Sequence, residues 1–305
     1  MTNKKRFLVL IPLTLTAILT VCWFLGSCAS IPPLKTKLYQ NTVKSDYLHE
    51  FSPRWSNVSA GVDVVSGKIS RPKIKFYAVR VNLSQNQIIL TPPKPENPPP
   101  KGKVYSIKVS SFATINNCLA AINAGPFFPV SARENEERTP VGLFVADGAV
   151  ISVQNPAYDA LVFYGDKEAA IVKQAAIKDV SGIKNGAGGF SIVLKDGLIN
   201  EKVLQNKQRH PRSAAGLGAG ADGSQILYLL VADGRWLDSQ GATETETGLL
   251  LRALGARDGI NLDGGGSSAM ALRIDGKVHI INRPIHNQIP GKERAVASCI
   301  GVKAR

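Results

Sequence analysis

Short apolar runs separated by Asp-Gly turns recur along most of the chain, and this alternation is the feature that most restricts its fold. Four of the Asp-Gly pairs separate such runs, at positions 147–148, 196–197, 222–223 and 275–276. Such a pair between apolar runs is typical of a tight β-hairpin, because both residues tolerate a positive φ. We expect strands at 58–65, 74–82, 87–90, 119–123, 142–145, 149–153, 160–164, 192–194, 214–217, 226–231, 259–262, 268–272 and 295–302.

Two segments have the apolar spacing of a helix, namely residues 110–117 and 243–254. Thr243 and Glu246 at the start of the second segment have the spacing of a capping box, so we interpret Glu246 as structural. Many strands with two helices predict an α+β fold. We expect strand-rich mixed and antiparallel sheets with a few flanking helices, in a single domain.

The N-terminus has the pattern of a lipoprotein signal peptide. Three basic residues at 4–6 precede an uncharged apolar run at 7–25, and Leu-Gly-Ser then leads into Cys28. A small residue before a cysteine suits cleavage that leaves a lipid-modifiable Cys28 at the new N-terminus. We therefore expect an exported protein, anchored to the bacterial cell envelope through lipid on Cys28. An uncleaved signal anchor is the alternative, because the run approaches the roughly 18 residues that can span a membrane.

These boundaries divide the chain into a signal peptide at 1–27, a tether at 28–56 and one domain at 57–305. Residues 91–100 contain six prolines, which lack the N–H that helices and inner strands need. We expect this stretch to be an exposed loop.

Composition restricts the partners and cofactors. Cleavage before Cys28 lowers the formal net charge from +14 to +11, and a basic exported domain suits an anionic polymer or a phosphate-bearing substrate. The basic residues are scattered without a nucleic-acid module, so we expect no nucleic-acid partner. The four histidines and the two remaining cysteines, Cys118 and Cys299, show no metal-ligand spacing, so we expect no metal and no cofactor. Whether Cys118 and Cys299 pair is left open by the sequence.

The strongest candidate site is the segment 261–268, Asn-Leu-Asp-Gly-Gly-Gly-Ser-Ser, at the end of an expected strand. Three consecutive glycines predict a sharp turn whose N–H groups converge on an anion, with Asp263 presented beside it. A purely structural glycine-rich hairpin is the alternative. The segment is not a P-loop, because no Gly-Lys-Ser/Thr follows it.

Two further segments end expected strands with polar groups. Asn123 and Gly125 precede Pro126 and two phenylalanines, and an amide such as Asn123 can hydrogen-bond to sugar hydroxyls. Arg212 and Ser213 stand at the entrance to another strand, where a guanidinium could bind phosphate through two donors.

The order and spacing of these segments resemble the phosphodiester glycosidase family. The matching blocks are Asn123-Ala124-Gly125, Pro211-Arg212-Ser213-Ala214, Asp233-Gly234-Arg235, residues 261–268 and Glu293-Arg294. They fall within residues 104–302. One departure is Pro126, which stands where the family runs directly from Asn-x-Gly into Phe-Phe.

The resemblance implies a hydrolase that cleaves the bond between a sugar's anomeric carbon and a phosphodiester, of the α-N-acetylglucosaminyl type. It implies that Asp263, Asp233 and Arg212 are catalytic, with Asp233 the second carboxylate. Substrate-binding roles are implied for Asn123, Gly125, Ser213, Arg235, Gly264, Gly265, Gly266, Ser267 and Arg294. A non-catalytic lipoprotein module that binds anionic glycans is the alternative, and a metal-dependent phosphodiesterase lacks the clustered ligands that it would need.

Overall fold

The computed structural model describes the backbone of residues 40–43 and all of residues 52–90 and 96–305. These residues belong to one folded unit, which begins at Leu38. The expected signal peptide, Cys28, most of the expected tether and residues 91–95 of the Pro-rich segment lie outside the described residues. Residues 40–43 form a strand, although they fall within the segment that we expected to be a tether.

The largest sheet has nine strands. Eight of them follow the order β1-β3-β4-β18-β17-β19-β15-β16, and β2 pairs with β3. Their bounds are β1 Gln40–Val43, β2 Ser56–Ser59, β3 Val62–Ile69, β4 Ile74–Asn82, β15 Ser191–Lys195, β16 Leu198–Ile199, β17 Arg212–Ala219, β18 Gln225–Ala232 and β19 Asp258–Asn261. The β1–β3 pair is parallel, and the other strand pairs of the described residues are antiparallel.

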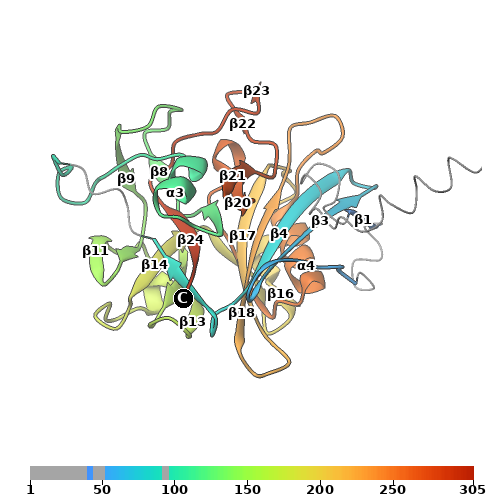
Figure 1. The fold of residues 1–305 in the computed structure, drawn as a ribbon, viewed down its shortest axis with the longest axis horizontal. Coiled ribbons are helices and arrows are strands. Elements are labelled where there is room, and N and C mark those ends of the chain that lie inside the picture. The colour runs from blue at the N-terminus through green and yellow to red at the C-terminus, as the bar shows by residue number, and fades with distance from the viewer. Residues whose placement is uncertain (1–39, 44–51, 91–95) are drawn as a thin grey trace, which may run out of the picture. The chain divides into compact units, whose positions relative to one another are not determined.

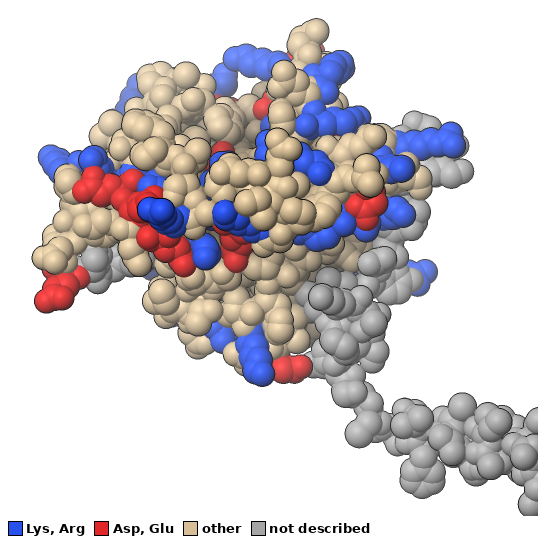
Figure 2. All heavy atoms as spheres, turned by 90° about the horizontal axis from the view of Figure 1, so that it is seen from above, with Lys and Arg blue, Asp and Glu red and all other residues tan. Residues whose placement is uncertain are grey.

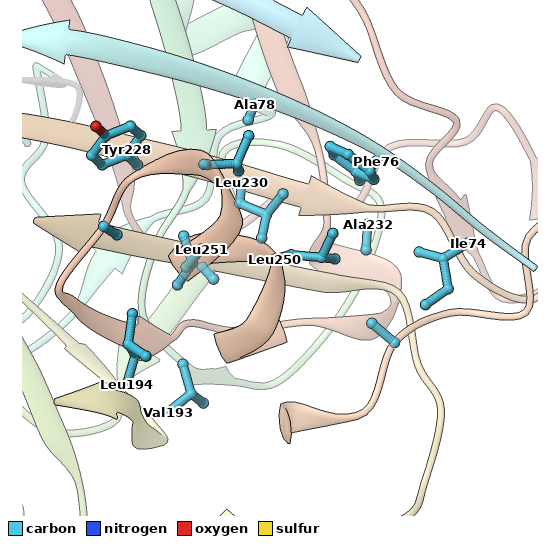
Figure 3. Packing of buried hydrophobic residues seen from close by; sticks show 14 of the residues in the cluster. Ile74, Phe76, Ala78, Val193, Leu194, Tyr228, Leu230, Ala232, Leu250 and Leu251 are labelled. Atoms are coloured by element: carbon cyan, nitrogen blue, oxygen red, sulfur yellow. The ribbon is translucent and has the colours of Figure 1, made fainter. Parts of the chain in front are cut away.

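Helix α4 (Glu244–Leu254) covers one face of this sheet, and the main hydrophobic core lies between them (Figure 1). Leu250 and Leu251 of α4 pack against Leu230, Phe76 and other apolar side chains of the central strands (Figure 3). Thr243 caps the helix: its hydroxyl accepts from the Glu246 N–H at 3.1 Å. The Glu246 carboxylate accepts from the Thr243 N–H at 2.9 Å, so the predicted capping box and structural role of Glu246 are confirmed.

A five-stranded sheet with the order β21-β20-β7-β24-β5 lies on the side of the large sheet away from α4 (Figure 1). Helix α3 (Val109–Ile115) lies against it. Its strands are β5 Asn86–Ile89, β7 Ala120–Asn123, β20 Met270–Ile274, β21 Lys277–Ile280 and β24 Cys299–Ala304. Cys118 and Cys299 are both buried in this region, and both are free thiols.

Three further sheets complete the described fold. One has the order β11-β10-β14-β12-β13, one has β6-β9-β8, and β22 pairs with β23. Their bounds are β6 Val104–Tyr105, β8 Phe127–Phe128, β9 Glu137–Pro140, β10 Phe144–Ala146, β11 Ala149–Ser152, β12 Asp159–Phe163, β13 Ala169–Lys173, β14 Asn185–Gly189, β22 Ile285–His286 and β23 Ile289–Pro290. Short 3-10 turns occur at η2 Gln174–Ala176, η3 Glu201–Val203 and η4 Gly265–Ser267.

The Asp-Gly pairs form the hairpins that the sequence predicts. Pairs 147–148, 196–197 and 275–276 have positive φ at both residues and join β10 to β11, β15 to β16 and β20 to β21. At 222–223 only Gly223 has a positive φ, and the turn joins β17 to β18. In all four turns the glycine has a positive φ, which it adopts readily because it has no Cβ to clash.

The expected fold class is confirmed in part. The described residues are strand-rich with antiparallel sheets, but they contain only two α-helices, so the protein is mostly β and α+β describes it loosely. Residues 58–65 form two strands and not one, because the chain reverses at Gly61, whose φ is 66°. Among the described residues, no helix has the length and the apolar character needed to cross a membrane.

Candidate active site

The candidate site lies where three strand ends meet. Strands β7 and β19 end there, and β17 begins there. The segment after β19 is fixed by backbone bonds from Leu262 N to Ser213 O at 2.8 Å and from Asp263 N to Ala124 O at 2.9 Å. Gly265 N donates to Pro211 O, also at 2.8 Å. These bonds bring the blocks around residues 123, 212 and 263 together, as the resemblance implies.

Asn123 joins the three strand ends and is fully buried. Its Nδ2 donates to the Asp263 carbonyl at 2.6 Å, and its Oδ1 accepts from the Ser213 hydroxyl at 2.7 Å and from Ala269 N at 3.3 Å. Asn123 and Ser213 therefore hold the site together. We expected Asn123 to bind sugar directly, but its side chain has no exposed atom that a sugar could contact.

Asp263 is the half-buried carboxylate of the site. Burial raises its pKa to about 6. The Ser267 hydroxyl, the Arg294 charge and the Gly264 N–H favour the ionised form, but they only partly offset desolvation. Asp263 is thus ionised at neutral pH and close to the pH at which it takes up a proton.

The three glycines of the turn serve different purposes. A Cβ at Gly264 would lie 2.7 Å from the Pro211 carbonyl oxygen, and one at Gly266 would lie 2.5 Å from Nη2 of Arg294. Gly265 has a φ of 62°. We expected a ligand to approach the backbone of these glycines closely. At Gly264 and Gly266 this space is instead occupied by Pro211 and Arg294. The Gly264 and Gly265 N–H groups are also engaged, by Asp263 and by Pro211, so they do not converge on an anion.

Arg294 is held beside Asp263 by two neighbours. Its Nη1 donates to the Ser267 hydroxyl at 3.2 Å, and its Nε donates to Nδ1 of His286 at 3.1 Å. Because Nδ1 accepts this bond, His286 is neutral and carries its proton on Nε2. Burial, together with the charges of Arg294 and Lys292, lowers the pKa of His286, which agrees with that tautomer.

Arg235 and Arg294 line a cavity of about 730 Å³. The remaining lining residues are Trp236, Ile285, Asn287, Gln288 and Pro290. Arg235 has a φ of 64°, a conformation that is uncommon for a residue with a side chain. Its Nη2 would lie 3.3 Å from a Cβ at Gly265. Two guanidinium groups thus face the glycine turn from the cavity.

Asp233 does not reach this cavity. Its side chain has no exposed surface and accepts from Arg283 Nε at 3.0 Å and Arg283 N at 2.9 Å. Arg283 in turn lies over the ring of Trp236, 4.6 Å from its centroid. The contacts make Asp233 a support for the Trp236 wall, and they leave it no oxygen with which to act as the second carboxylate.

Arg212 is buried and has a protein partner for every nitrogen. Its Nε donates to Ala242 O at 3.0 Å, its Nη2 donates to Gln208 O at 3.2 Å, and its Nη1 lies 3.6 Å from Glu244. These contacts anchor the start of β17 to the N-terminus of α4. Arg212 is therefore less able than Arg235 or Arg294 to bind a phosphate.

Gly125 lies close to the backbone of another strand. A Cβ there would lie 2.8 Å from the Gly188 carbonyl oxygen of β14, so this glycine allows two backbones to approach. Sequence reasoning missed His286 and the cavity wall that includes Trp236, Ile285 and Pro290. No local pattern could have revealed them, because their contacts with Arg294 and Arg283 are set by the tertiary fold.

The comparisons show the family to which the chain belongs. The family model for phosphodiester glycosidases matches residues 116–303, which is more than half of the chain, and the chain therefore belongs to the phosphodiester glycosidase family. Membership indicates a hydrolase of the glycosidase type. A search of the curated proteins gives no match.

Solved structures share the fold. A hypothetical protein from Synechocystis superposes with a TM-score of 0.60 at 16% identity, covering 83% of this chain and 64% of that one. The catalytic domain of zebrafish N-acetylglucosamine-1-phosphodiester alpha-N-acetylglucosaminidase, auto-inhibited by its pro-peptide, gives 0.55 at 18% identity and covers 83% of this chain and 88% of that one. A Burkholderia pseudomallei protein described as exported gives 0.53 at 15% identity, covering 76% and 74%.

Proposed function

We propose that this protein hydrolyses the bond between the anomeric carbon of a sugar and the phosphate of a sugar-1-phosphodiester. The observation that carries the proposal is the half-buried carboxylate of Asp263 at the glycine turn, where the charge of Arg294 acts on it and Arg235 lies beside Gly265. A carboxylate beside an anion-binding site weakens anion affinity. It becomes useful when positive charge develops on the sugar during the reaction.

The arrangement suits departure of a phosphate. As the C–O bond breaks, the electron pair goes to the leaving phosphate oxygen, and the growing negative charge meets Arg235 and Arg294. Asp263 stabilises the oxocarbenium character at the anomeric carbon. Water supplies the hydroxyl that the sugar gains and the proton that balances the products, which are a free sugar and a phosphomonoester.

The finer points of the proposal rest on resemblance and on the N-terminal sequence. We propose an N-acetylglucosaminyl group on the sugar side, in line with the name of the zebrafish relative. We also propose that the protein acts outside the cytoplasm, in the cell envelope, anchored through Cys28.

The decisive experiment measures which product incorporates the oxygen of water. The domain without its signal peptide is incubated with UDP-sugars and synthetic sugar-1-phosphodiesters in oxygen-18 water. Cleavage of the C–O bond places the label in the sugar, and we expect this result. Label in the phosphate would show attack at phosphorus and refute the proposed reaction.

A non-catalytic glycan-binding module remains the second candidate, because the same arginines would bind a glycan phosphate without turnover. Tight binding of a phosphodiester with no release of sugar, under conditions where the folded protein is intact, would favour it. The half-buried Asp263 argues against this candidate, because a carboxylate next to the anion only weakens such binding.

A further inference from the structure

The cavity beside Arg235 and Arg294 is larger than a hexose phosphate requires, and part of its wall is apolar. A cavity of about 730 Å³ holds a ligand of drug size, which is bigger than a hexose phosphate. Trp236, Ile285 and Pro290 form an apolar part of its wall, and Asn287 and Gln288 complete it beside the two arginines. Such a wall suits a part of the substrate that carries neither charge nor many hydroxyls.

Two exposed apolar residues are direct chain neighbours of residues in this wall. Leu237 is 96% exposed and follows Trp236 in the chain, and Ile289 is 47% exposed and lies between Gln288 and Pro290. Other apolar side chains are also exposed singly, which is ordinary for a protein surface. What distinguishes Leu237 and Ile289 is that each is a chain neighbour of residues that line one cavity.

Both segments are held in place by the fold. Asp238, next to Leu237, pairs with Arg283 at 2.8 Å and with Lys75 at 2.5 Å. Ile289 begins β23, and its hairpin turn has positive φ at both Asn287 and Gln288, as a tight turn requires. The two apolar side chains are therefore presented by ordered segments beside a cationic cavity.

Charge determines which end of the substrate meets this wall. The phosphate belongs between Arg235 and Arg294, and the sugar belongs on the side of Asp263. The group beyond the phosphate then extends along Trp236 toward the rim. Figure 2 looks onto this end of the molecule, where Lys and Arg predominate over the centre and right, while Asp and Glu gather mainly at the left.

We propose that the alcohol on the far side of the phosphate is a long apolar chain, an alkyl or isoprenoid alcohol, and that it lies along Trp236 and over Leu237 and Ile289. This inference rests on the proposed function, because it assigns the second ester of the same phosphodiester. The substrate class is thus a lipid-linked sugar-1-phosphate.

The test compares two ligands that differ only in chain length. The methyl and decyl diesters of N-acetylglucosamine-1-phosphate are titrated calorimetrically against Asp263→Asn, which prevents turnover, and hydrolysis of both is followed with the wild-type chain. Each methylene that leaves water strengthens binding about fourfold. A partly covered decyl chain should therefore bind roughly tenfold to a hundredfold more tightly than methyl.

The variant pair Leu237→Gln and Ile289→Gln, made together, should bring the ratio of decyl to methyl affinity near one. Leu198→Gln with Val153→Gln is the matched control, because these apolar side chains are also exposed, at 71% and 69%, and neither is a chain neighbour of a cavity-lining residue. The control should keep the preference for decyl.

Equal affinity for the two diesters, or an equal loss in the control pair, overturns the inference. Binding of phosphatidylcholine vesicles that depends on Leu237 and Ile289, without a preference for decyl, shows a lipid surface as the occupant and also overturns it. A decyl preference without hydrolysis of either diester refutes the proposed function and supports the assignment of the apolar chain.

Discussion

At Asp263 the fold keeps a carboxylate in a place where burial disfavours its charge. Burial raises its pKa to about 6 from a usual value of 3.8, so the folded state takes up a proton more readily than the unfolded chain. The stability that protonated Asp263 contributes is complete below about pH 4 and is lost as pH rises through about 6. At neutral pH the ionised side chain costs up to about 3 kcal/mol.

Asp263→Asn should therefore abolish turnover and stabilise the protein at pH 7. Asn keeps the size and removes the charge that is costly to bury. Urea unfolding at pH 7 and pH 4 checks the stability, and the gain should shrink toward pH 4. The wild-type kcat/KM should rise with pH through an apparent pKa near 6. A folded variant with near-normal kcat would contradict the assigned role.

Arg294 and Arg212 provide a comparison between an arginine at the cavity and one in a buried network. Arg294→Ala should lower kcat/KM for phosphodiesters by roughly 10²- to 10³-fold, because the leaving phosphate loses a charged donor. A neutral aryl glycoside should lose much less. The outcome that contradicts this role is an equal loss for both substrates, which would make Arg294 structural.

Arg212→Ala should act mainly on stability. It removes the cation beside Glu244, which keeps only the Asn261 amide, and the donor to the Gln208 carbonyl. Loss of one member of a buried ion pair costs about 3 to 5 kcal/mol. Denaturant unfolding measures the cost. If Arg212→Ala is as stable as wild type and loses only phosphodiester activity, Arg212 binds the phosphate directly, as the resemblance implied.

At the scale of elements, the glycine turn after β19 can be dissected by substitution. Gly265→Ala should cost about 1 to 2 kcal/mol, because its φ of 62° is left-handed, while the nearest atom to the new Cβ belongs to the mobile end of Arg235. Gly264→Ala should cost more, because its Cβ meets the Pro211 carbonyl at 2.7 Å. Equal unfolding midpoints for the two variants would contradict this order.

The turns could be predicted from the sequence because their causes are local. An Asp-Gly pair and a Thr-x-x-Glu capping box each satisfy their own conformational needs within a few residues. Strand β14, Asn-Gly-Ala-Gly-Gly, was missed because glycine is depleted in strands. Its glycines serve packing: Gly188 lies against Gly125, and a Cβ at Gly189 would lie 2.8 Å from the Asn261 carbonyl oxygen.

The location of the site could be predicted from the sequence, but the roles of its individual residues could not. The blocks around residues 123, 212 and 263 meet, because strand ends bring them together. Which polar side chain faces the cavity depends on tertiary partners. The polar atoms of Asn123 and Arg212 form hydrogen bonds within the protein. Arg294 is oriented by His286, which no sequence motif marks as a site residue.

At the scale of the whole molecule, strands from two different sheets contribute residues to the site. The nine-stranded sheet supplies β17 and β19, and the sheet on its other face supplies β7. Asn123 binds across them to Ser213 and Asp263. A protein that acts on lipid-linked substrates would benefit from being held near a membrane, and the N-terminal sequence predicts such an attachment.

Cys28→Ala should leave the full-length precursor unprocessed, because a lipoprotein peptidase requires lipid on the cysteine that follows the cleavage site. Residues 4–6 and the apolar run at 7–25 are unchanged in this variant, so membrane targeting itself is retained. Cys22→Ala is the matched control, since it removes a cysteine from within the apolar run and should be processed normally. Metabolic labelling with palmitate and the gel mobility of both variants give the readout. Normal processing of Cys28→Ala, or equal palmitate incorporation in it, would show that Cys28 is not the anchor.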